Sequence, residues 1–242
     1  MRRGIPALGM VALAGAALLG AGCGLQRQQQ VFFAPSNVAN YVLFGQVTRA
    51  GGPIAGKSVK LYSTASGALL DSLLTDATGG YGFPSAPSGE VMVKVSSDDS
   101  LDFAYVRYIF TRSSSVERDS IPPMDLRAYG CAAIAPVSGA RVPVPSPNAP
   151  LAFSWTPMSV AGTIKYRARL ADAADSTVWE STRDIGTSAL FNGIGTFGAY
   201  AGMLLGPGEY QWRVKVRFPT GVTAATRQRP LIFTSGLAGA PR

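Results

Sequence analysis

The chain has 242 residues, and 22 Lys and Arg against 14 Asp and Glu give it a formal net charge of +8. It contains no histidine, which excludes Ser-His-Asp and Cys-His catalysis and removes the commonest metal ligand in proteins. The basic residues are scattered along the chain, so we expect no nucleic-acid partner. Attraction to acidic glycans or lipid headgroups, or solubility alone, explains the positive charge.

The N-terminal segment has the pattern of a secretory signal. Arg2 and Arg3 precede a short apolar run that ends in Leu19-Gly20-Ala21-Gly22-Cys23. The run is shorter than a membrane-spanning helix needs. Its end resembles the signal of bacterial lipoproteins, although Gly20 stands where Leu is usual. The resemblance implies a signal peptide at residues 1–22, acylation of Cys23 and a membrane anchor in the bacterial cell envelope. An ordinary cleaved signal with a chance cysteine is the alternative.

The remaining length and composition indicate two domains behind a tether. Residues 23–40 are rich in Gln and then in Pro, Ser and Asn, a composition that builds no core, so we predict a lipidated tether there. Cleavage after residue 22 leaves 220 residues, which suits two domains of about 100 residues each. We place them at 41–128 and 129–236, followed by a tail at 237–242. With Cys23 acylated, Cys131 has no partner within the chain and is either a buried small residue or a link between chains.

The first predicted domain consists of short strands separated by turns. Strands are expected at 41–48, 57–62, 69–75, 90–95 and 104–111, and no segment shows a helical period with caps. In residues 90–95 the alternation places Val91, Val93 and Val95 on one face. Regularly spaced short strands with Gly and Pro turns are typical of an antiparallel sandwich.

A family resemblance accompanies this pattern. Residues 44–47, 52–54, 59–61, 75–83 and 87–91 read FGQV, GPI, VKL, TDATGGYGF and PSGEV. Their order resembles that of carboxypeptidase-regulatory-like domains, which are similar to transthyretin in fold. The resemblance covers about residues 41–128 and implies a domain that scaffolds or binds and has no peptidase activity of its own.

The most specific part of this resemblance is a tight turn. Asp76 and Thr78 can bond turn amides, and Gly79 and Gly80 allow positive φ. Tyr81 and Phe83 then begin the next strand, with both side chains in the core.

Residues 112–131 are rich in strand breakers, among them Pro122 and Pro123, and we interpret them as a junction. The second domain is expected to form strands at 151–155, 164–170, 177–180, 188–191, 208–218 and 231–233. The segments 136–140 and 143–150 are rich in Pro and Gly, which predicts short strands near a sheet edge.

The strand at 208–218 is the clearest in the chain, and its alternation places Tyr210, Trp212, Val214 and Val216 inward. The sequence Leu-Gly-Pro-Gly-Glu-Tyr before it, at residues 205–210, together with Phe-Ser-Trp at 153–155, resembles a fibronectin type III domain. The resemblance implies that the Tyr210 hydroxyl bonds to nearby backbone and locks a corner. The predicted fold class is therefore all-β, with two antiparallel β-sandwich domains in tandem.

No catalytic set, cofactor motif or metal motif is present, so we expect a protein that is not an enzyme and holds no cofactor or metal. Asp98, Asp99 and Asp102 carry the hard oxygens that calcium prefers, but a solvated loop explains them equally. Two function classes stay open. One is a non-catalytic, lipid-anchored envelope protein that binds or scaffolds an envelope protein partner. The other is a glycan-binding accessory module at the cell surface.

The glycan alternative requires tryptophans that stack on sugar. Trp155 and Trp212 lie at inward positions, and only Trp179 is expected at the surface. Acidic glycan is a further candidate partner of an outward basic stripe, although polar alternation alone explains that stripe. Its members are Arg167, Arg169, Arg213, Lys215 and Arg217.

The long segment 191–205 is the candidate partner-binding site, because long loops without structure of their own are often functional in compact domains. Its large apolar residues Phe197, Tyr200 and Met203 belong to types enriched at protein interfaces. The alternative is that they cap the open end of the sandwich or form a short helix there.

Overall fold

The computed structural model describes residues 38–160, 162–182 and 186–235, all of which belong to one compact unit. The predicted signal peptide, Cys23, the tether up to residue 37 and the tail lie outside the described residues. Across the described ranges the regular structure is strands and two short 3-10 helices, η1 (Val38–Asn40) and η2 (Gly198–Tyr200). Neither of these described helices is long and apolar enough to cross a membrane.

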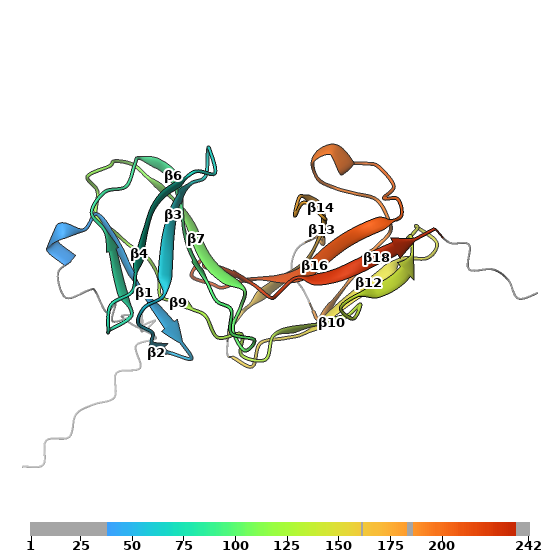
Figure 1. Ribbon diagram of the computed structural model, residues 1–242, viewed down its shortest axis with the longest axis horizontal. Helices are drawn as coiled ribbons and strands as arrows, with labels where there is room; N and C mark the ends of the chain where they lie inside the picture. The colour runs from blue at the N-terminus through green and yellow to red at the C-terminus, as the bar shows by residue number, and fades with distance from the viewer. Residues whose placement is uncertain (1–37, 161, 183–185, 236–242) are drawn as a thin grey trace, which may run out of the picture. The chain divides into compact units, whose positions relative to one another are not determined.

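The described part of the first half, blue to green in Figure 1, forms the first set of strands. They are β1 (Leu43–Arg49), β2 (Gly52–Pro53), β3 (Ser58–Ser63), β4 (Leu69–Leu74), β5 (Gly80–Phe83), β6 (Gly89–Ser96), β7 (Tyr105–Arg112), β8 (Asp119–Ser120) and β9 (Met124–Asp125). One layer is β4-β3-β6-β7, and the other holds β2, β1 and β5, with β8 and β9 parallel to β1. Val91, Val93 and Val95 are buried between the layers, as their alternation predicts.

The described part of the second half forms the other strands. They are β10 (Ala132–Ala135), β11 (Ala140–Pro143), β12 (Leu151–Thr156), β13 (Lys165–Asp172), β14 (Thr177–Glu180), β15 (Ser188–Phe191), β16 (Gly208–Arg217), β17 (Thr223–Ala225) and β18 (Arg229–Thr234). One layer is β10-β12-β15, and the other runs from β11 through β18 and β16 to β13 and β14. The predicted all-β class of two β-sandwiches is confirmed. The short strand β11, which overlaps the segments expected near an edge, lies at the edge of its sheet, and β10 is an edge strand as well.

Aromatic rings fill the second core. The ring centroid of Phe153 lies 4.9 Å from that of Trp212 and 5.6 Å from that of Trp179, which in turn lies 5.0 Å from Phe191. Trp212 is fully buried, and its Nε1 donates to the Pro136 carbonyl at 3.2 Å, so the indole keeps a hydrogen bond inside the core. This cluster explains why the inward face of β16 is so strictly apolar.

The two sandwiches share one ten-stranded sheet. The short strand β17 pairs with β16 on one edge and with β7 on the other, so that the order reads β11-β18-β16-β17-β7-β6-β3-β4. The Ala104 amide donates to the Ala225 carbonyl at 2.8 Å, and the Phe103 ring lies 6.4 Å edge-on from Phe218. The outward faces of β7 and β16 therefore belong to one continuous surface.

Residues 112–131, interpreted as a junction, largely complete the first sandwich. β8 and β9 pair with β1, and Ile121 and Met124 are buried. The Arg112 side chain is also buried, where its guanidinium donates to Asp119 Oδ2 at 2.7 Å, to the Ala86 carbonyl at 2.9 Å and to the Glu117 carbonyl. The Arg112 side chain thereby connects the end of β7 to the start of β8 and to Glu117, two residues before it.

The turn at residues 76–80 forms largely as predicted. Asp76 Oδ1 accepts from the Thr78 hydroxyl at 2.7 Å and from the amides of Gly80 at 2.9 Å and Thr78 at 2.8 Å. Burial raises the Asp76 pKa, but these three bonds together outweigh it and lower the pKa. Gly79 adopts a φ of +72°, where a side chain would also meet the Val47 carbonyl, whereas Gly80 does not adopt positive φ. Tyr81, two residues on, is buried as expected.

Cys131 is a buried free thiol in the core of the described part of the chain. Burial raises the pKa of the thiol to about 12, so it stays protonated and unreactive at neutral pH. The structure thus favours the interpretation of Cys131 as a small core residue.

Candidate functional site

The segment from residue 192 to 205 is a folded loop. The Gly195 amide donates to the Met203 carbonyl and the Leu205 amide to the Gly193 carbonyl, at 2.9 and 2.8 Å. A Cβ at Gly195 would lie 2.3 Å from the Tyr200 carbonyl oxygen, so only glycine allows the two arms of the loop to approach this closely. The expected alternative of a short helix here agrees with η2 at Gly198–Tyr200.

The loop is tied down by Tyr200 but keeps large apolar side chains at the surface. The Tyr200 hydroxyl donates to Asp172 Oδ2 at 3.1 Å, and this bond raises the Tyr200 pKa. Phe197 is 41% exposed, Met203 57% and Leu204 66%. Of the three predicted binding residues, Phe197 and Met203 are available to a partner, whereas Tyr200 is half-buried and anchors the loop.

The corner before β16 has the predicted geometry. The Tyr210 hydroxyl donates to the Gly206 carbonyl at 3.0 Å, and the ring packs 4.7 Å from that of Phe233. Burial raises the Tyr210 pKa. Tyr210 therefore supports the fold beneath the loop.

The tryptophans do not form a sugar-stacking platform. The expectation that Trp179 is exposed is wrong, because it stacks on Phe153 in the core and is only 6% exposed. Trp155 and Trp212 are buried as well. The sequence of β14 is too short for its alternation to predict which side chains face the core. The buried face of β14 depends instead on its pairing with β13.

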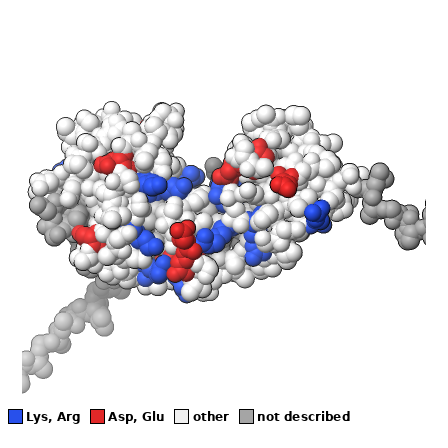
Figure 2. Space-filling model, viewed as in Figure 1, with Lys and Arg blue, Asp and Glu red and all other residues white. Residues whose placement is uncertain are grey.

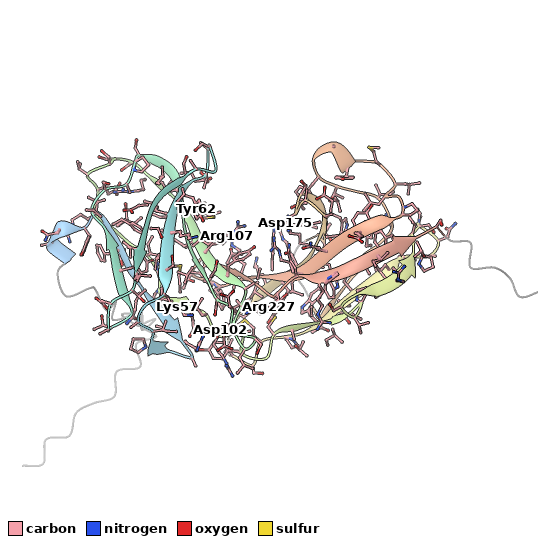
Figure 3. All side chains as sticks on the ribbon, viewed as in Figure 1. Lys57, Tyr62, Asp102, Arg107, Asp175 and Arg227 are labelled. Carbon is pink, nitrogen blue, oxygen red and sulfur yellow. The ribbon has the colours of Figure 1, made fainter. Side chains whose placement is uncertain are left out.

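Asp99 and Asp102, two of the acidic residues considered as calcium ligands, form ion pairs with Arg49. Asp102 is 3% exposed, accepts from Arg49 Nε at 3.1 Å and from Ser97 Oγ at 2.7 Å, and Asp99 lies 3.3 Å from the same guanidinium. Figure 3 labels Asp102 beside the strands of the first sandwich. Within the described ranges, no three His, Cys, Asp or Glu side chains gather as a metal site would need.

The predicted basic stripe forms on the outward face of β13 and β16. Arg167 lies opposite Lys215 and Arg169 opposite Arg213 in the antiparallel register, and Arg217 pairs with Lys165. Among the described residues, two carboxylates form ion pairs with members of this stripe. Glu180 binds Lys215 and lies 3.6 Å from Arg167, and Asp175, labelled in Figure 3, binds Arg169 and Arg213.

Part of the stripe lines a cavity of about 510 Å³, which sequence analysis did not anticipate. The cavity lies beside β17, and residues of β7, β13, β14, β16 and β17 surround it. Its charged lining is Arg107, Lys165, Arg167, Lys215, Arg217 and Glu180. In Figure 2 the basic side chains gather over the middle of the view.

Comparison with known proteins shows no matching family model and no matching curated protein. Solved structures with some similarity include latent PorU from Porphyromonas gingivalis, with 14% identity and a TM-score of 0.32 over 74% of this chain and 16% of that one. The fibronectin(III)-like modules of Clostridium thermocellum CbhA share 13% identity and a TM-score of 0.31 over 82% and 94%. The FN1-FN3 domains of chicken CNTN1 share 16% and 0.28 over 84% and 69%. The present chain thus spans a small part of PorU, and its structural neighbours include fibronectin III-like modules.

Proposed function

We propose that this chain is a non-catalytic, lipid-anchored protein of the bacterial cell envelope that binds a protein partner through the loop of residues 192–205. The observation that carries the proposal is the exposure of Phe197, Met203 and Leu204 on a loop that is otherwise held rigidly. Exposed large apolar side chains close together are typical of interaction sites.

Rigidity makes this loop suited to binding. Its two arms are hydrogen-bonded to each other, the Thr196 amide donates to the Val178 carbonyl, and Tyr200 is tied to β13. A loop that is already ordered loses little conformational entropy on binding, so its apolar contacts contribute more fully to affinity.

The domain assignments fit this role. The segment order and the turn at Asp76 support a carboxypeptidase-regulatory-like first domain at 41–128, and the Tyr210 corner supports a fibronectin III-like second domain at 129–236. The first of these resemblances implies a module that binds or scaffolds. The alternative of a glycan-binding module based on tryptophan stacking is disfavoured, because the three indoles are buried.

The loop is tested by changing its exposed side chains only. Phe197→Ser with Met203→Ser is expected to abolish binding to the partner and to leave the melting temperature nearly unchanged, because surface substitutions of this kind usually alter stability by less than about 0.5 kcal/mol. A photocrosslinking amino acid at position 197, activated in living cells, should give a discrete crosslinked protein that disappears with Met203→Ser.

The matched control uses the outer strand of the first sandwich. Leu69 and Leu74 are 51% and 66% exposed on β4, so Leu69→Ser with Leu74→Ser removes a similar apolar area elsewhere. A crosslink that is as strong at position 74 as at 197, or a large fall in melting temperature for the loop variant, would contradict the proposed site.

The anchor is tested at Cys23. Two or more acyl chains hold a protein firmly at a membrane, so the wild-type chain should sediment with membranes and incorporate labelled fatty acid. Cys23→Ala is expected to abolish labelling and to release the protein or accumulate its precursor. Cys131→Ala, which removes the buried thiol, should leave labelling intact. Labelling that survives Cys23→Ala would refute acylation at this residue.

A further inference from the structure

The shared sheet carries a row of five cations and one threonine that crosses the boundary between the two sandwiches. Lys60 pairs with Lys94 on the neighbouring strand, Lys94 with Arg107, Arg107 with Thr223, Thr223 with Arg217, and Arg217 with Lys165. We call these six residues the basic row. Strands lie about 4.8 Å apart, so the basic row extends over about 24 Å.

The basic row runs through the cavity of about 510 Å³ described above. Arg107, Thr223, Arg217 and Lys165 are four consecutive members of the row, and all four line the cavity. Five cations and one carboxylate give the charged lining a net charge of +4. This cavity and the basic row together form what we call the basic groove.

The two described carboxylates nearest the groove are already engaged by other cations. Glu180 is engaged by Lys215 and Arg167, and Asp175 is shared between Arg169 and Arg213. Arg217 is exposed and makes no ion pair or hydrogen bond with a described residue. Nε of Arg107 is a buried donor without a partner among the described atoms. Buried donors usually have partners, and an anion would supply one.

The cations are also crowded against one another. Lys94, Arg107 and Arg213 all contact the ring of Tyr105, at 4.9, 5.7 and 5.3 Å from its centroid. Burial lowers the pKa of Lys94, and the charges of Arg107, Arg213 and Lys60 lower it further. Like charges that are gathered and partly desolvated raise the local positive potential, which favours a bound anion.

We propose that the basic groove binds a linear polyanion, an acidic glycan with a negative group on successive sugars. Lys60, Lys94 and Arg107 follow one another at the strand spacing, as do Arg217 and Lys165 beyond Thr223. This spacing is close to the length that one pyranose ring adds to a glycan chain. Arg107 and Arg217 can each hold a carboxylate or phosphate through paired N–H groups. No tryptophan stacking is involved, and this site is independent of the loop at 192–205.

The shape of the basic groove favours a flexible polyanion as the ligand over the flat surface of a lipid bilayer. The cavity is recessed between strands, and Glu180 stands within it, so a planar bilayer would contact the outer cations and leave the lining unreached. A single small anion would engage one or two members of the row. A flexible polyanion can enter the recess and continue along the row toward Lys94 and Lys60.

The experiment measures binding of the full chain, purified in detergent, to polygalacturonate. Fully methyl-esterified polygalacturonate has the same backbone without charge and is expected not to bind. Arg217→Gln should weaken binding about threefold to fivefold, the effect of one exposed ion pair, and Arg107→Gln with Arg217→Gln about tenfold or more. Raised salt should weaken wild-type binding by screening. Glu180→Gln should instead strengthen binding, because it removes the anion that competes for Lys215 and Arg167.

Arg141→Gln is the matched control, since Arg141 is exposed on β11 and lies outside the basic groove. Arg217 is exposed too, so its variant is expected to keep the wild-type melting temperature. Wild-type affinity in the double variant, or an equal loss with Arg141→Gln, would overturn the proposal. If Arg217→Gln weakens only the binding of vesicles of phosphatidylglycerol and phosphatidylcholine, and polygalacturonate does not bind, the groove serves a lipid surface and the glycan assignment is wrong.

Discussion

Replacing Arg112 with leucine is expected to lower the free energy of unfolding by about 3–5 kcal/mol, the range for removing one partner of a buried charged pair. The Arg112 side chain is fully buried and serves three acceptors, Asp119 and the carbonyls of Ala86 and Glu117. Leucine would leave all three without a donor, while the loop that enters β8 loses its attachment. Urea unfolding followed by tryptophan fluorescence measures the change.

Two controls separate this effect from the loss of a positive charge. Arg141→Leu removes an exposed arginine and should change stability by less than about 0.5 kcal/mol. Arg112→Lys keeps the charge but cannot reproduce the planar fork of donors, so it should also destabilise the protein. If Arg112→Leu and Arg141→Leu unfold at the same urea concentration, the buried network does not contribute to stability.

Tyr210→Ala is expected to lower the free energy of unfolding by roughly 3–5 kcal/mol, as for other large buried aromatic residues. Tyr210 is 8% exposed, and its ring packs on Phe233. Tyr210→Phe keeps the ring and removes only the bond to the Gly206 carbonyl, so it should cost about 0.5–1.5 kcal/mol. Thermal unfolding of both variants gives the comparison.

Comparing the loss of unfolding free energy in Tyr210→Phe with that in Tyr210→Ala separates the hydrogen bond from the packing of the ring. A loss with Tyr210→Phe as large as that with Tyr210→Ala would show that the hydroxyl bond, and not core packing, holds the corner. If Tyr210→Ala melts with the wild type, the ring is not part of the core and the packing described for β16 is wrong.

Much of the fold was predictable because strand alternation is a local signal. In β6 and β16 the inward residues could be assigned from period two alone, and the structure buries Val91, Val93, Val95, Trp212 and Val214 as expected. The Asp76 turn and the Tyr210 corner could also be predicted from the sequence, because each depends on hydrogen bonds between residues no more than four positions apart in the chain. The loop at 192–205 was recognisable from its length and its apolar composition, but the anchoring role of Tyr200 was not.

Short segments were decided by tertiary contacts. Trp179 belongs to a strand of four residues, too few to reveal which face is buried, and its pairing with β13 turns it into the core. β8 and β9 contain two residues each and exist only because β1 lies beside them. Arg112, at the end of β7, is buried because three acceptors from separate segments converge on it.

By itself the sequence determined the strand pattern, the absence of histidine chemistry and the basic alternation on β13 and β16. Only the tertiary structure decided that β17, whose Thr223-Ala224-Ala225 carries a weak strand signal, pairs with both β16 and β7. That pairing joins residues more than a hundred positions apart and places Arg107 in one row with Arg217 and Lys165. Register between distant strands depends on contacts that local periodicity does not encode, and the basic groove follows from that register.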